Sequence, residues 1–388
     1  MLRRVLLTAV FTLGVALAGS VRADPPFRYP EGKSGTGELK YRNGLPVLTV
    51  AGTPEEIGKA VGVLALKPGR RITSYPEDIL KTFMVGYLWK PVYQLGQSMV
   101  ERFPADYRTE MEAMAQAAEV DRDKLVVANT LFDLKKVIAC SALLVEPDRS
   151  ATGGSLLGRN LDFPNLGYAH EYSLVTVYRP QGAKHNFATI GFPGIVGCLS
   201  GMNDAGLAVA VLEVTQVKVG EPRFDINGLP YGMCYRRLLE ECTTVTEAFA
   251  LLSQMKRTSL SSLAVADREG VAVFEITPQR VIMRRGLKGT TICTNHFCTD
   301  ELRPHLPVNF IQTFERFAAL EKLAELQNPL GPAELHVGMH FTCGDSTMQT
   351  MIFEPATLRL HLAIGSVPSS AQELRVLDLG PLLRGQTN

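Results

Sequence analysis

The stretch KKVIACSALL, residues 135–144, marks the place where the sequence pattern changes from helical to strand-like. Before it, RTEMEAMAQAAEV (108–120) and KLVVANTLFDL (124–134) carry apolar residues at helical spacing. After it, short runs rich in Val, Ile and Leu alternate with Gly, Asn and Asp turns, which is typical of strands. Cys140, the first of the seven cysteines, lies at this change.

The rest of the chain continues in blocks of helices and strands. We expect an extended lead-in, rich in Pro and Gly, at 24–50, and helices over 53–136, the first of which begins at Thr53-Pro54. Further helices are expected at 231–241, 244–255 and 309–326, further strands between 261 and 296, and a hairpin at 347–355 and 358–365. Strands in close succession, with helices inserted in blocks, favour an α+β fold over a doubly wound parallel sheet.

The first 23 residues are expected to be a signal peptide rather than part of the fold. Arg3 and Arg4 precede an apolar run at 5–18, and small residues lead to a cleavage position after Ala23. The alternative is an uncleaved membrane anchor, but the apolar run is short for a spanning helix. No later stretch is long and apolar enough to span, so we expect a secreted or periplasmic protein.

Composition narrows the class of partner. The chain has 388 residues, 46% hydrophobic and 20% charged, and a formal charge of only +1, so nothing indicates a nucleic-acid partner. The seven cysteines form no Cys-x-x-Cys pair, which argues against a zinc or redox motif. Because every cysteine lies at or after position 140, no disulfide can join residues 24–139 to the remainder.

Two stretches carry candidate site residues. Cys140 is either a nucleophile, which needs a base nearby to form the thiolate, or a small apolar residue on a buried strand. In GRNLDFP (158–164), Arg159 falls on one face of an extended strand, and Asn160 and Asp162 fall on the other. Such charges at the end of an apolar strand need partners, unless they simply form a surface ion pair in a turn.

The stretch TNHF (294–297) offers two more candidates, since Asn295 could donate to an oxyanion and His296 could act as a base. His336 and His340 have metal-ligand spacing, but Val337 replaces the catalytic Glu of that motif, so we expect no metal site.

Two glycine-rich motifs are not expected to form a functional site. GFPGIVG (191–197) opens no helix and is not expected to bind phosphate. GCLSG (197–201) lacks the spacing of a Gly-x-Ser-x-Gly nucleophile elbow.

Cys140, GRNLDFP, GMNDAGLAVAV (201–211) and TNH occur in this order in a chain that resembles the N-terminal-nucleophile (Ntn) hydrolases. The chain is most similar to the acyl-coenzyme A:6-aminopenicillanate acyltransferase family, and more distantly to choloylglycine hydrolases, acid ceramidase and N-acylethanolamine acid amidase. The resemblance implies a four-layer αββα sandwich of two antiparallel sheets, with an N-terminal helical segment.

The resemblance also implies a precursor that cuts itself. Cys140 attacks the carbonyl of Ala139, and hydrolysis of the thioester leaves fragments 24–139 and 140–388, which remain associated. The new α-amino group of Cys140 then acts as the base, because such amines titrate near about pH 7.7–8.0. The thiol then needs no histidine motif around it to supply a base.

Site roles follow from the same resemblance. Asp162 resembles the acid that holds the new amine, Arg159 the cation that supports the thiolate, and Asn295 the oxyanion donor. The resemblance requires no cofactor and no metal. The chain departs from its relatives at Ala139 and at the Ser-Ala pair after the nucleophile, and it carries Glu213 where choloylglycine hydrolases have Asn, which argues against bile-salt cleavage.

The predicted function is therefore an exported amidase or acyltransferase acting on a small N-acyl amide or thioester. Hydrolysis is favoured, because the exterior of a cell holds little acyl-coenzyme A. Two alternatives stay open. One is an exported papain-like cysteine protease that uses Cys140 with His296 and does not cut itself. The other is a non-catalytic binding protein on the same fold, with Cys140 buried and inert.

Overall fold

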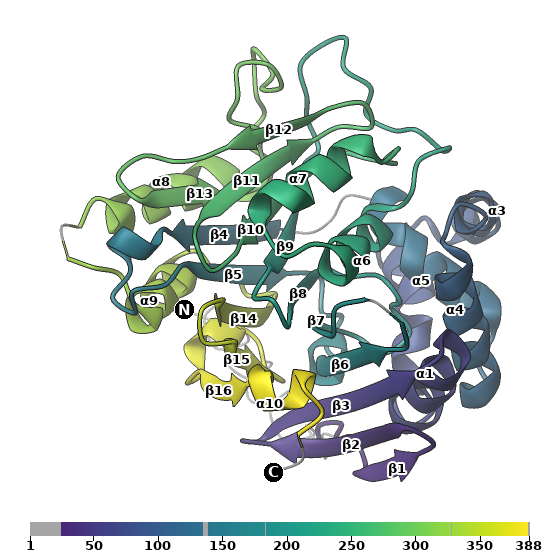
Figure 1. Ribbon diagram of the computed structural model, residues 1–388. Coiled ribbons are helices and arrows are strands. Elements are labelled where there is room, and N and C mark those ends of the chain that lie inside the picture. Colours follow the sequence, from purple (N-terminus) through teal and green to yellow (C-terminus); the bar gives the residue numbers. More distant parts are fainter. Residues whose placement is uncertain (1–24, 135–138, 183, 327, 387–388) are drawn as a thin grey trace, which may run out of the picture.

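Two β-sheets lie face to face at the centre of the computed structural model, which describes residues 25–134, 139–182, 184–326 and 328–386 (Figure 1). One sheet has ten strands in the order β1-β2-β3-β6-β7-β8-β9-β10-β11-β12, and the other has six in the order β13-β4-β5-β14-β15-β16. The predicted signal peptide lies outside the described residues. No helix within them is long and apolar enough to cross a membrane.

The ten-stranded sheet comprises β1 (Gly32–Ser34), β2 (Gly37–Arg42), β3 (Leu45–Gly52), β6 (Leu174–Pro180), β7 (Phe187–Gly191), β8 (Ser200–Asn203), β9 (Ala208–Glu213), β10 (Ser261–Ala266), β11 (Val271–Ile276) and β12 (Val281–Arg284). The six-stranded sheet comprises β4 (Ala139–Val145), β5 (Leu156–Asp162), β13 (Thr290–Cys293), β14 (Thr347–Glu354), β15 (Arg359–Ile364) and β16 (Arg375–Asp378).

Helices cover both outer faces. The α-helices are α1 (Pro54–Val61), α2 (Tyr75–Thr82), α3 (Trp89–Val100), α4 (Ala105–Ala118), α5 (Arg122–Leu134), α6 (Tyr231–Glu241), α7 (Val245–Gln254), α8 (Thr313–Ala324), α9 (Pro332–Phe341) and α10 (Leu379–Leu383). A π-helix spans Gly62–Leu66, and 3-10 turns span Arg70–Ser74, Gly86–Leu88, Pro147–Arg149, Ala169–Tyr172, Phe310–Gln312 and Ser369–Ala371.

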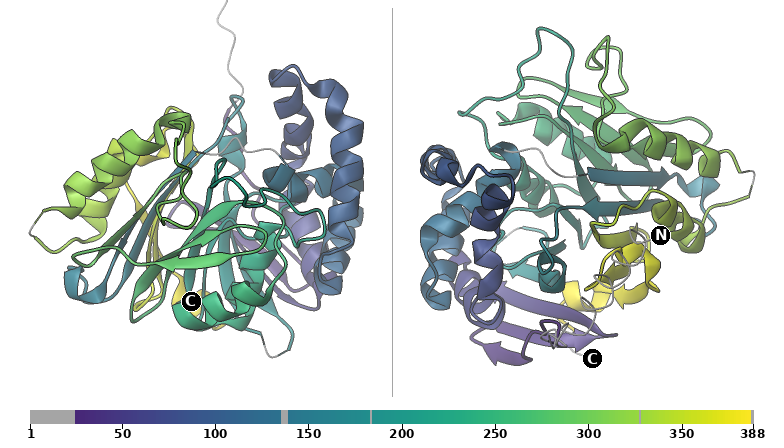
Figure 2. Two further views of the ribbon diagram at one scale, coloured as in Figure 1. Left: turned by 90° about the horizontal axis from the view of Figure 1, so that it is seen from above. Right: turned by 180° about the vertical axis from the view of Figure 1, so that it is seen from behind.

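The layers follow the predicted αββα order. Helices α8 and α9 pack on the six-stranded sheet, whereas α1, α6, α7 and α10 pack on the ten-stranded sheet. The view from above shows α8 and α9 on one outer side and the helices of the N-terminal segment on the other (Figure 2). The inner faces meet where β4 contacts β9, β10 and β11, and their apolar side chains form the main core. The α+β class and the four-layer order are confirmed.

The lead-in at 24–50 was predicted wrongly, because β1, β2 and β3 occupy most of it and form one end of the ten-stranded sheet. The β2–β3 turn is Asn43-Gly44, in which both residues have positive φ, and Asn-Gly is a strong signal for a tight hairpin. The N-terminal segment is thus part sheet and part helix. Strand β3 pairs in parallel with β6, while all other strand pairs in the described chain are antiparallel.

Other local expectations are confirmed. Thr53 caps α1 with a full capping box, which agrees with the predicted helix start. The predicted hairpin at the C-terminal side is the β14–β15 pair, although β16 and α10 follow it. The seven cysteines, whose pairing the sequence left open, are all free thiols, and five of them are buried.

Candidate active site

Cys140 is the second residue of β4, and its side chain is fully buried between the two sheets. The guanidinium of Arg159, on the neighbouring strand β5, donates from Nη2 to Cys140 Sγ at 3.1 Å. The same Nη2 donates to the carbonyl of Val211 at 2.8 Å, and Nη1 donates to the hydroxyl of Ser200. The sequence predicted that Arg159 supports the thiol, and the structure places it in direct contact with the sulfur.

The surroundings of Arg159 are unusual for a buried cation. Its side chain is 0% exposed, yet within the described residues it pairs with no carboxylate, and its Nε has no acceptor. An uncompensated buried charge is costly unless an anion is formed nearby. Burial raises the pKa of the Cys140 thiol to about 11, and the charge of Arg159 opposes this rise. In the uncut chain the thiol is therefore neutral at pH 7, with a cation already in contact with it.

Asn295, which follows β13, contacts the backbone of the candidate nucleophile. Its Oδ1 accepts from the Cys140 amide N at 2.9 Å and from Arg316 Nη2 at 2.6 Å, while its Nδ2 donates to the carbonyl of Glu213 at 2.8 Å. Two donors on one side fix the orientation of the amide group. In the uncut chain Asn295 thus holds the nitrogen that cleavage would turn into the α-amine.

Sequence reasoning missed Arg316, which lies on α8. Its Nη1 donates to the Cys140 carbonyl and to the Ser141 hydroxyl, the latter at 2.9 Å. A signal was present, because Thr313, Arg316 and Leu320 lie at helical spacing and form the buried face of α8. An arginine on the apolar face of a helix needs a polar partner in the core, and here that partner is the backbone of the nucleophile.

Asp162 is at the end of β5, directly opposite Ala139 in the antiparallel register of β4 and β5. It is 3% exposed, and Thr347 donates a hydrogen bond from its hydroxyl to Oδ1. Burial raises the pKa of Asp162 to about 6, opposed by the Thr347 hydrogen bond and by the charges of Arg316 and Arg159. The carboxyl thus lies beside the bond predicted to break and titrates near neutral pH.

Glu213, noted in the sequence only as a departure from relatives, is the last residue of β9 and is buried. Tyr231 donates from its hydroxyl to Glu213 Oε1 at 3.2 Å. Since the Glu213 carbonyl also accepts from Asn295, this residue connects the ten-stranded sheet to the nucleophile.

The remaining candidate residues form no hydrogen bond to Cys140 within the described part of the chain. His296 Nδ1 bonds to the hydroxyls of Thr294 at 3.1 Å and Thr313 at 2.9 Å, and burial lowers the pKa of His296 to about 4. His336 and His340 share a face of α9, where both contact Ser370. No cluster of three or more His, Cys, Asp or Glu in the described part of the chain is placed to hold a metal ion.

Two pockets adjoin the site. An apolar pocket lies between α2, α5 and the 192–195 loop, and it is also lined by Phe163 and Met348, the residues that follow Asp162 and Thr347. A second pocket of about 670 Å³ adjoins the other end of the site, because Val214 and Thr215, which follow Glu213, line it together with Asp133 and Arg223.

Part of the sequence matches a known protein family. The family model for acyl-coenzyme A:6-aminopenicillanic acid acyl-transferase matches residues 149–329. The chain resembles this acyltransferase family. The matched range contains Arg159, Asp162, Asn295 and Arg316, and it begins after Cys140. The family match supports acyl-transfer or amide-cleaving chemistry.

A sequence relative is also known. An uncharacterized protein of Archaeoglobus fulgidus is 24% identical over 277 residues, which cover 62% of this chain and 45% of that protein. This chain therefore spans less than half the length of the curated relative that it matches.

Solved structures show weaker likenesses. They include a mutant of the conjugated bile acid hydrolase from Clostridium perfringens (TM-score 0.44, 13% identity, 64% of this chain and 93% of that one). A second is the Caenorhabditis elegans ortholog of N-acylethanolamine-hydrolyzing acid amidase (0.43, 14%, 61% and 100%), and a third is penicillin V acylase from Agrobacterium tumefaciens (0.42, 15%, 58% and 82%). Likenesses at this level carry no inference about activity.

Proposed function

We propose that this chain is an exported, self-processing cysteine hydrolase that cleaves a small N-acyl amide through an acyl-enzyme on Cys140. The observation that carries the proposal is the set of contacts around one residue. Arg159 contacts the Cys140 sulfur, Asn295 contacts its nitrogen, and Arg316 contacts its carbonyl. A structural cysteine needs none of these contacts, whereas a residue that must serve as both thiolate and amine uses all of them.

Self-processing would proceed in two steps. Cys140 Sγ attacks the carbonyl carbon of Ala139, the C–N bond to Cys140 breaks, and the thiol proton passes to the departing nitrogen. Water then hydrolyses the thioester, which leaves a carboxylate on Ala139 and a free thiol on Cys140. Asp162 lies opposite Ala139, so its carboxylate is placed to hold the new ammonium group.

Turnover would repeat this chemistry on a substrate. The α-amine takes the thiol proton, the thiolate attacks the acyl carbon, and the proton is passed to the leaving amine. We assign Asn295 two roles, since Oδ1 positions the amine and Nδ2 faces the developing oxyanion once the segment before Cys140 has left. Water completes the cycle, and an acceptor amine in its place would give acyl transfer.

The apolar pocket suggests the nature of the acyl group. Its lining is almost wholly aliphatic and aromatic, and Phe163 brings it to the catalytic end of β5. We therefore propose that the acyl group is apolar, and that the leaving amine faces the more polar pocket beside Glu213.

Intact mass of the purified chain tests the proposal. Wild type should yield two fragments that divide between Ala139 and Cys140, and Cys140→Ala should stay one chain. A folded wild type that remains whole would refute self-processing. Activity is then measured on N-acyl amides of graded chain length, and a cut enzyme that cleaves none of them would refute the amidase.

The histidine-dependent alternative is disfavoured by a specific observation. His296 Nδ1 is bonded to two threonine hydroxyls, and burial lowers the pKa of His296 to about 4, which makes it a weak base for the Cys140 thiol. A His296→Ala variant that still cuts itself and turns over substrate would exclude this alternative.

A further inference from the structure

A polar pocket far along the ten-stranded sheet has the chemistry of an anion site. It lies between the β1–β2–β3–β6 end of that sheet and the end of α10, and it has a volume of about 610 Å³. Its lining consists of Lys33, Gly35, Thr36, Gly37, Glu38, Arg42, Thr49, Arg179, Leu382, Gly385 and Gln386. The lining holds three basic side chains and one carboxylate.

Strand register places four polar side chains of this lining on one face of the sheet. Glu38 pairs with Thr49 across β2 and β3, and Ala51 pairs with Arg179 across β3 and β6. Side chains alternate along a strand, so Glu38, Arg42, Thr49 and Arg179 share one face of the sheet. The opposite face packs on α1, since a Cβ at Gly37 would lie 2.7 Å from the Ala60 side chain.

The single carboxylate is already neutralised. Glu38 pairs with Lys40 at 2.8 Å and with Lys33 at 3.3 Å, and Lys40 is the first cause of its lowered pKa. By contrast, Arg42 and Arg179 form no side-chain hydrogen bond or ion pair within the described residues, and Arg179 Nε is shielded from solvent without an acceptor. A buried donor without an acceptor calls for a bound water or ion.

Gly385 leaves room for the guanidinium of Arg179. It has φ +73°, and a Cβ at this position would lie 2.4 Å from Arg179 Nη1. The end of α10 therefore closes one wall of the pocket against Arg179 rather than leaving the arginine in open solvent.

We propose that this pocket binds a small oxyanion, namely a phosphate group, with the guanidinium of Arg179 as its main ligand. A guanidinium suits a tetrahedral oxyanion, because it can present a fork of N–H donors to two oxygens, and Lys33 and Arg42 add positive charge to the same lining. The phosphate can be free or the headgroup of an anionic lipid. The lining draws Lys33 and Arg42 from one predicted fragment and Arg179 from the other, and the site does not depend on cleavage.

Calorimetric titration of the full-length Cys140→Ala chain with sodium phosphate tests the site, with sodium chloride at equal ionic strength as the blank. We expect saturable binding that weakens by on the order of tenfold or more in Arg179→Gln and by less in Arg42→Gln, which removes a more distant charge. The control Arg303→Gln removes an exposed arginine elsewhere and should leave affinity unchanged. Gly385→Ala keeps every charge but crowds Arg179, so it should also weaken binding.

A second arm identifies the source of the phosphate. Sedimentation is measured with phosphatidylcholine vesicles with and without phosphatidic acid. Binding to the acidic vesicles that Arg179→Gln abolishes supports the pocket as a headgroup site. The proposal is overturned if neither free phosphate nor acidic vesicles bind saturably, or if Arg179→Gln, with an unchanged melting temperature, binds either of them as well as wild type.

Discussion

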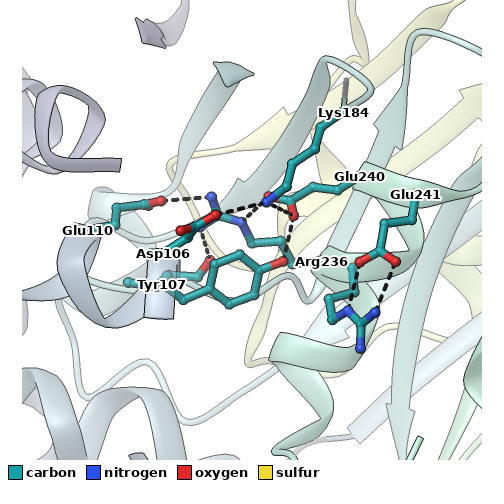
Figure 3. Close-up of polar contacts among 9 residues, drawn as sticks. Asp106, Tyr107, Glu110, Lys184, Arg236, Glu240 and Glu241 are labelled. Atoms are coloured by element: carbon teal, nitrogen blue, oxygen red, sulfur yellow. Dashed lines mark hydrogen bonds and ion pairs between the residues drawn. The ribbon is translucent and has the colours of Figure 1, made fainter. Parts of the chain in front are cut away.

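The interface cluster, formed by Asp106, Tyr107, Glu110, Lys184, Arg236 and Glu240, gives the sharpest prediction about how the two predicted fragments are held together (Figure 3). Arg236, on α6, donates to Glu110 on α4 at 2.7 Å and to Glu240 at 3.0 Å. Tyr107 donates to Glu240 at 2.7 Å, and Arg236 lies over the Tyr107 ring at 4.3 Å. These contacts cross from the N-terminal segment to the remainder of the chain.

The perturbation is Arg236→Met, and helix α6 supplies a matched control. Arg236 and the adjacent Arg237 each pair with a glutamate four residues later, but side-chain exposures are 4% and 1% in the first pair and 31% and 36% in the second. Removing the buried cation leaves Glu110 and Glu240 without it, which costs about 3–5 kcal/mol. Removing the exposed cation in Arg237→Met costs about 0–0.5 kcal/mol.

Both Arg236→Met and Arg237→Met are made in the uncut Cys140→Ala chain, and the shift of each urea unfolding midpoint is measured. The double variant Arg236→Met with Glu110→Gln should recover part of the loss, because burial is the main cause of the raised pKa of Glu110 and a neutral amide avoids that cost. In the self-cut protein, gel filtration of Arg236→Met should show separated fragments at low concentration. Equal midpoints for Arg236→Met and Arg237→Met would refute this reasoning.

Three further predictions concern the site. Self-cleavage should slow as pH falls through about 6, where the raised pKa of Asp162 lies, because only the carboxylate form can hold the new ammonium group. The Asp162→Asn variant should lose this fall in rate when the rate of cleavage is followed against pH by mass spectrometry. Because the pKa of Asp162 is raised, the folded chain binds more protons than the unfolded chain between about pH 4 and 6. Asp162 therefore makes the free energy of unfolding fall as pH rises through this range. Urea midpoints of Cys140→Ala, measured with and without Asp162→Asn, should show this fall only when Asp162 is present. Arg316→Lys should slow self-cleavage by about tenfold or more, because a single ammonium cannot reach both the Cys140 carbonyl and Asn295, and an unchanged rate would contradict the assigned role.

Much of the fold was predictable because local pattern and tertiary structure agree. The strands after residue 139 are apolar runs bounded by turns, and Thr53-Pro54 begins a helix as its chemistry predicts. The three N-terminal strands were missed because this stretch is rich in proline and glycine, which are depleted in strands, although Asn43-Gly44 is a hairpin turn signal. The parallel pairing of β3 with β6 joins segments far apart in sequence, and no local pattern reports such a pairing.

The candidate site, like the fold, could be predicted from the sequence only in part. Arg159 and Asp162 could be found because both belong to the polar motif at the end of an apolar run, and Asn295 because it follows another such run closely. Arg316 could be suspected only as an arginine on the apolar face of a helix, since its partners belong to β4, a strand far away in the sequence.

The burial of Cys140 bears on how such a site could be activated. The thiol is fully enclosed and its pKa is raised to about 11, so in the uncut chain it can reach no external substrate and carries little thiolate at pH 7. The peptide carbonyl of Ala139 directly precedes Cys140 in the chain. Cleavage there would create a base on the same residue and free the segment that leads to the sulfur. A thiol enclosed in this way is either an inert structural residue or a nucleophile whose first reaction is with its own chain. Comparing wild type with Cys140→Ala decides between these two roles.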